Sequence, residues 1–109
     1  MGKPGNSNER LVKVGSMKRD EVLEKLLQML KTYGAKKVVL FGSYARGEEN
    51  PESDIDVIVE FSESKSLLEL VRIEREISEA LGIKVDLLTE KSVSPYLMDA
   101  IRKEMRVLL

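Results

Sequence analysis

A glycine–serine pair is followed, ten residues later, by two aspartates separated by one residue, and each part suits chemistry at a phosphate. The residues are Gly42-Ser43 and Asp54-Ile55-Asp56. Glycine lets the backbone approach a ligand closely, and a helical turn that opens at Ser43 would offer free N–H groups to an anion. Carboxylates two apart on a strand share a face and can bind the same hard cation. The spacing therefore predicts a site for a nucleotide with a divalent cation.

A third aspartate has the same placement on a later segment. The segment 83–89 alternates well enough to be a strand, and Asp86 lies on the face opposite to its apolar residues. If this strand pairs with a strand over 54–61, three carboxylates converge. Three carboxylates that hold two ions suit in-line displacement at phosphorus, in which one ion activates the attacking hydroxyl and the other stabilises the leaving pyrophosphate.

Helical and strand patterns alternate along the chain and predict an α/β layer with a mixed or parallel sheet. The predicted elements are a helix over 18–33, strands over 37–41 and 54–61, a helix from a capping box at Ser66 to Gly82, a strand over 83–89 and a last helix from Pro95 to Leu109. Two of these helices have clear apolar stripes. The stripes are Leu67, Leu70, Ile73, Ile77 and Leu81 in the first, and Leu97, Ile101, Met105 and Leu108 in the second.

The composition predicts one small catalytic domain. Of 109 residues, 42% are hydrophobic, which is enough for one modest core. Residues 1–16 are rich in Gly, Pro, Asn and Ser and are predicted to be a flexible leader, so that 17–109 form a single domain. The chain has no Cys and no His, which excludes thiolate nucleophiles, cysteine zinc sites and a histidine base. Catalysis must then use carboxylates, hydroxyls, Lys, Arg and hard cations.

Charge and hydropathy exclude two kinds of partner. A net charge of −1 gives no electrostatic attraction for long nucleic acid. No apolar stretch is long enough to cross a membrane and no signal-peptide pattern is present, so we expect a cytoplasmic protein without membrane contact. The apolar residues 107–109 at the end of the last predicted helix leave a homo-oligomer or a partner contact open.

The segment from Gly42 to Asp56, GSYARGEENPESDID, followed by VIV and later by Val85-Asp86, resembles the minimal nucleotidyltransferases of the DNA polymerase beta superfamily. The resemblance extends from about Asp20 to the C-terminus. It implies the nucleotidyltransferase fold, a small mixed sheet flanked by helices, and Mg²⁺-dependent transfer of a nucleoside monophosphate, AMP from ATP, to a hydroxyl.

The same resemblance implies roles for individual residues. Gly42 and Ser43 would hold the triphosphate, and Asp54, Asp56 and Asp86 would bind metal, with two Mg²⁺ ions expected and Mn²⁺ as an alternative. The fork geometry of Arg46 suits phosphate as well. Arg46 could instead pair with the nearby Glu48 or Glu49, and the sequence leaves both readings open.

Stand-alone prokaryotic members of this family act as antitoxins beside HEPN-domain ribonuclease toxins, and some adenylylate a toxin tyrosine. The chain has no second domain that could choose an acceptor, so the resemblance implies a helical HEPN-type toxin as partner. Two alternatives stay open. The acceptor could be a small molecule or an RNA end, or the chain could be a binding module that neutralises a partner without catalysis. The sequence does not specify the base of the nucleotide.

Overall fold

The computed structural model describes residues 18–109, so the predicted leader over 1–16 lies outside the described residues. Helices and strands alternate from there to the C-terminus. In chain order they are α2 (Arg19–Thr32), β1 (Ala35–Phe41), α3 (Ser43–Arg46), β2 (Ile55–Phe61), α4 (Leu67–Leu81), β3 (Val85–Leu88), the 3₁₀ turn η1 (Glu90–Ser92), α5 (Pro95–Arg102) and β4 (Arg106–Val107).

The four strands form one mixed sheet in the order β3-β2-β1-β4. Strand β1 runs antiparallel to both β2 and β4, while β2 and β3 are parallel. A parallel pair needs a crossover connection, which α4 provides. The prediction of a small mixed sheet flanked by helices is confirmed.

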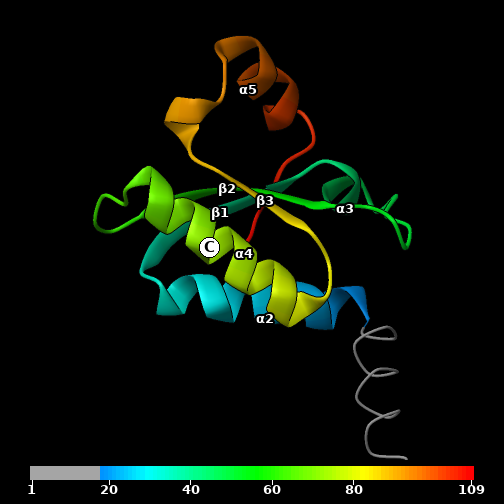
Figure 1. The fold of residues 1–109 in the computed structure, drawn as a ribbon. Coiled ribbons are helices and arrows are strands. Elements are labelled where there is room, and N and C mark those ends of the chain that lie inside the picture. The colour runs from blue at the N-terminus through cyan, green and yellow to red at the C-terminus, as the bar shows by residue number, and fades with distance from the viewer. Residues whose placement is uncertain (1–17) are drawn as a thin grey trace, which may run out of the picture.

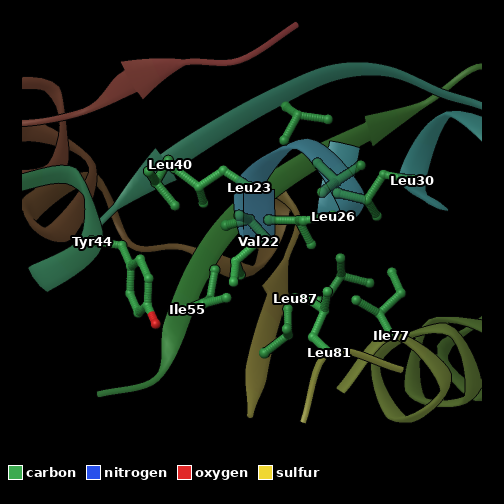
Figure 2. Packing of buried hydrophobic residues seen from close by; sticks show 14 of the residues in the cluster. Val22, Leu23, Leu26, Leu30, Leu40, Tyr44, Ile55, Ile77, Leu81 and Leu87 are labelled. Carbon is green, nitrogen blue, oxygen red and sulfur yellow. The ribbon is translucent and has the colours of Figure 1, made fainter. Parts of the chain in front are cut away.

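Helices cover the two faces of the sheet unequally. Helices α2 and α4 lie side by side on one face, and α5 lies on the other (Figure 1). The larger apolar core is between the sheet and the α2–α4 layer, as Figure 2 shows for Leu26, Leu30 and Ile77. A smaller cluster lies under α5 and consists of Val39, Ile58, Val93 and Ile101. Among residues 18–109, no helix has both the length and the apolar composition to cross a membrane.

Helix α4 begins where the sequence predicts, because Ser66 and Glu69 form a capping box. The Ser66 hydroxyl accepts the backbone N–H of Glu69 at 3.2 Å, and the Glu69 carboxylate accepts the N–H of Ser66 at 2.8 Å. The predicted apolar stripe is wrong at its first position, since the side chain of Leu67 is 76% exposed. Leu67 belongs to the first turn, beyond the part of the helix that packs on the sheet.

The prediction of a last helix that reaches Leu109 is wrong. Helix α5 ends at Arg102, and Arg106–Val107 pairs with Val39 and Leu40 as strand β4. Of the predicted stripe, Ile101 is buried, whereas Leu97 is 47% and Met105 38% exposed. The free edge of β1 has backbone groups that need partners, and residues 106–109 supply them, since Val38 also exchanges backbone hydrogen bonds with Leu108 and Leu109.

Strand boundaries differ from the predictions by one or two residues. Strand β1 begins at Ala35, and β3 is limited to Val85–Leu88. Strand β2 begins at Ile55, so that Asp54 directly precedes the strand and only Asp56 lies within it.

Candidate functional site

The turn after β1 has a conformation that only glycine adopts readily. Gly42 has φ 76° and ψ −157°, and α3 begins at the next residue. The backbone N–H groups of Ala45 and Arg46 both donate to the Gly42 carbonyl, at 3.0 and 3.1 Å. The N–H groups of Ser43 and Tyr44 precede the first intrahelical bonds of this turn, so they are the ones available to an anion.

Sheet pairing brings two of the predicted carboxylates together beside this turn. Asp56 is the register partner of Asp86 in the parallel β2–β3 pair and of Phe41, the residue before Gly42, in the antiparallel β1–β2 pair. A Cβ atom on Gly42 would overlap the Asp56 Oδ2 atom and lie 3.3 Å from Cγ. The backbone of the turn therefore packs directly against the carboxylate of Asp56.

The three carboxylates interact electrostatically. Burial raises the pKa of Asp56 from 3.8 to about 6, assisted by a hydrogen bond with Asp86 and by the charges of Asp86 and Asp54, while the charge of Arg46 opposes the shift. Lys84 Nζ lies 3.9 Å from Asp86 Oδ1 and offsets part of the negative charge. Asp56 is thus a half-buried acid with the carboxylates of Asp86 and Asp54 nearby.

This arrangement suits a divalent cation, although the ligand set stays a prediction. Carboxylate oxygens are the donors that Mg²⁺ prefers, and the register pairing places those of Asp56 and Asp86 side by side. Between residues 18 and 109, no three acidic side chains are already placed to hold one ion. Asp56 and Asp86 are paired, and Asp54 lies one residue before β2.

Arg46 lies in α3 beside this site and is engaged by two glutamates. Its Nε donates to Glu48 at 2.8 Å, which is one of the partners that the sequence suggested, and its Nη1 donates to Glu104 Oε2 at 2.6 Å. The two hydrogen bonds raise the pKa of Arg46. The sequence does not predict Glu104 as a partner, because Glu104 is 58 residues from Arg46, in the segment predicted to be the last helix.

The other predicted partner of Arg46 has a different role. Glu49 Oε1 lies 3.4 Å from Nε of Arg19, in the first turn of α2. The guanidinium of Arg19 also donates to the backbone carbonyl of Tyr44 in α3. Arg19 therefore links α3, which follows the turn at Gly42, to α2, a role that no local pattern in the sequence indicated.

The raised pKa of Asp56 predicts a pH dependence of stability in protein without metal. The folded state binds a proton more tightly than the unfolded state, so the free energy of unfolding should fall as the pH rises from about 4 to about 6. Asp56→Asn should flatten this dependence and melt higher than wild type at pH 7 in EDTA. Urea unfolding across this pH range checks the prediction, and an equal slope in both proteins would contradict it.

Comparisons with known proteins place this site in context. A model of the nucleotidyltransferase domain family matches residues 19–108. The chain is 48% identical over 88 residues to a Methanocaldococcus jannaschii protein provisionally named protein adenylyltransferase MJ0435, which covers 81% of this chain and 95% of the relative. It is 32% identical over 77 residues to the protein adenylyltransferase MntA of Thermococcus cleftensis, which covers 71% of this chain and 78% of the relative.

A solved structure agrees with the sequence relatives. A crystal structure of a toxin–antitoxin with AMP-PNP superposes with a TM-score of 0.71 at 25% identity, covering 79% of this chain and 71% of that chain. The region that the family model matches, residues 19–108, includes the sheet and the helices that position Gly42, Asp56 and Asp86.

Proposed function

The chain belongs to the nucleotidyltransferase domain family and is a nucleotidyltransferase, and from this premise we propose that it transfers AMP from ATP to a hydroxyl of a partner protein. One observation carries the proposal. The turn at Gly42 packs against Asp56, which is paired with Asp86. Groups suited to a triphosphate and groups suited to a cation therefore meet at one point.

Each residue of the site has a distinct role in this proposal. Gly42 and Ser43 bind phosphate oxygens through the backbone and the serine hydroxyl, and Asp54, Asp56 and Asp86 hold the divalent cation, Mg²⁺ or Mn²⁺. The cation supplies positive charge that makes phosphorus easier to attack and the acceptor hydroxyl more acidic. Arg46 can turn from its two glutamates to the triphosphate, since its side chain is partly exposed.

The reaction is a displacement at the α-phosphorus of ATP. The acceptor oxygen forms a bond to this phosphorus, the bond to the oxygen that bridges to the β-phosphate breaks, and pyrophosphate leaves. The acceptor proton passes to a carboxylate, because the chain has no histidine. We assign this base to Asp86, which lies beside Asp56 on β3 and whose side chain is 37% exposed, so that an acceptor can reach it.

The proposed acceptor is a tyrosine of a helical HEPN-type toxin, with this chain as the antitoxin. Two findings support it. Relatives bear the name protein adenylyltransferase, and a structural neighbour is described as a toxin–antitoxin. An acceptor that belongs to another molecule is also consistent with residues 18–109, because the helices of this domain all pack on the one sheet that carries the site.

Calorimetry with ATP and Mg²⁺ tests the site assignment. Wild type should bind ATP with Mg²⁺. A free ATP concentration of one hundred times the Kd should add about 2.7 kcal/mol to the free energy of unfolding. The double variant Asp54→Asn/Asp56→Asn should lose this binding. Asp99→Asn removes a surface carboxylate from α5 and serves as the matched control. Equal affinity in the double variant and in wild type would remove the metal assignment.

A further inference from the structure

Among residues 18–109, strand β3 lies at one edge of the sheet, pairs with β2 alone and carries Asp86. In a parallel strand, successive backbone groups point alternately to the neighbouring strand and away from it. The carbonyl of Lys84 faces β2 and accepts the N–H of Ile55 at 2.9 Å. The N–H groups of Val85 and Leu87 consequently point away from β2, toward a side on which the described part of the chain places no strand.

Two side chains of α4 occupy this edge. The Ser78 hydroxyl accepts the N–H of Val85 at 2.9 Å, and the Glu74 carboxylate accepts the N–H of Leu87 at 2.8 Å. Glu74 and Ser78 are one helical turn apart, so they project from the same side of α4. Both bonds are partly buried, and the bond from Glu74 is charge-assisted, which makes it the stronger of the two.

The two hydrogen bonds bracket Asp86. They hold the residue before it and the residue after it, whose side chains are buried in the core facing α4. The backbone on both sides of Asp86 is thereby held from the helix side, with Glu74 bound to the peptide that directly follows Asp86, while β2 holds the strand from the other side. An edge strand of four residues without these bonds would have its free N–H groups satisfied by water and would fray more readily.

We propose that Glu74, assisted by Ser78, is a positioning residue that holds Asp86 beside Asp56 for the cation and the acceptor. This rests on the proposed function, because it assumes that Asp86 binds metal. Glu74 does not touch substrate or metal. It acts by fixing the backbone of β3, in the way that groups around a metal site orient the ligands themselves.

The test uses Mn²⁺ alone as the probe, titrated into the full chain and followed by electron paramagnetic resonance of the free ion. Glu74→Ala should weaken Mn²⁺ binding about 10-fold, and Ser78→Ala should weaken it less. Glu74→Gln keeps an oxygen acceptor and should bind within about 3-fold of wild type. Glu79→Ala changes an exposed glutamate of the same helix and should bind as wild type does.

Two further measurements separate positioning from general loss of structure. Amide hydrogen exchange at Leu87 should become faster in Glu74→Ala, while exchange in β1 stays slow. The double variant Glu74→Ala/Asp86→Asn should bind Mn²⁺ no more weakly than Asp86→Asn alone, because Glu74 acts through Asp86.

The results also separate failure of the positioning role of Glu74 from failure of the proposed function. Wild-type Mn²⁺ affinity in Glu74→Ala, together with faster exchange at Leu87, would overturn the positioning role and leave the proposed function intact. Equal losses in Glu74→Gln and Glu74→Ala would overturn it too, because charge and not the hydrogen bond would then matter. Equal Mn²⁺ binding by wild type and Asp86→Asn would remove Asp86 from the metal ligands, and the positioning role of Glu74 with it.

Discussion

Asp86→Asn is expected to lower the rate of AMP transfer by roughly 10²–10⁴-fold, the usual contribution of a general base, while most of the affinity for ATP with Mg²⁺ is kept. Asparagine fills the same space beside Asp56 but cannot accept the acceptor proton. The triphosphate would still have the turn at Gly42 and the remaining carboxylates. A loss in kcat without a matching rise in KM marks a group that acts mainly in the transition state.

Single-turnover transfer with labelled ATP, combined with calorimetry on the same samples, measures both quantities. Asp99→Asn again controls for loss of a surface carboxylate. Transfer at the wild-type rate by Asp86→Asn would show that another group takes the proton. A parallel loss of binding and transfer would instead assign Asp86 to holding nucleotide and metal alone.

Gly42→Ala is expected to have the second-largest effect. Alanine is strained at this backbone conformation by about 1–3 kcal/mol, and its Cβ would overlap the Asp56 carboxylate. The carboxylate must move, so both stability and the binding of ATP with Mg²⁺ should fall. Ser43→Ala should cost less, since it removes one hydrogen bond to a charged group, worth about 1.5–3 kcal/mol.

Gly47→Ala is the matched control for this prediction. Gly47 also has a positive φ, 73°, but a Cβ there would meet no atom within 4 Å. Both variants should therefore lose stability, and only Gly42→Ala should lose nucleotide binding beyond what its stability explains. Thermal unfolding and calorimetry separate the two effects. Equal nucleotide affinity in the two variants would reduce Gly42 to a turn residue.

The placement of the carboxylates could be predicted because it depends on local rules. Side chains alternate along a strand, so Asp56 and Asp86 had to lie opposite the apolar residues of their own strands. The intervening segment reads as a helix, which favours a parallel crossover and hence pairing of the two strands. The structure makes these two aspartates register partners. Their roles as ligands and base remain predictions.

The end of the chain could not be predicted in the same way. Helical spacing is present at Ile101, Met105 and Leu108. Whether the segment forms a helix depends on the edge of β1, which is distant in sequence and pairs with Arg106–Val107 instead. The contacts of Arg46 with Glu104 and of Arg19 with Glu49 have the same origin. Each joins residues that only the completed fold brings together, and no local pattern marks them.

The most direct test of the central claim is the intact mass of a partner. The chain is co-expressed with a candidate HEPN-type partner taken from the neighbouring reading frame, and the mass of the purified partner is measured after co-expression with wild type and with Asp86→Asn. The account predicts at least one added adenylyl group on a tyrosine with wild type and none with Asp86→Asn. A partner that stays unmodified with wild type, and is inhibited equally by both proteins, would contradict the account and identify a binding module instead.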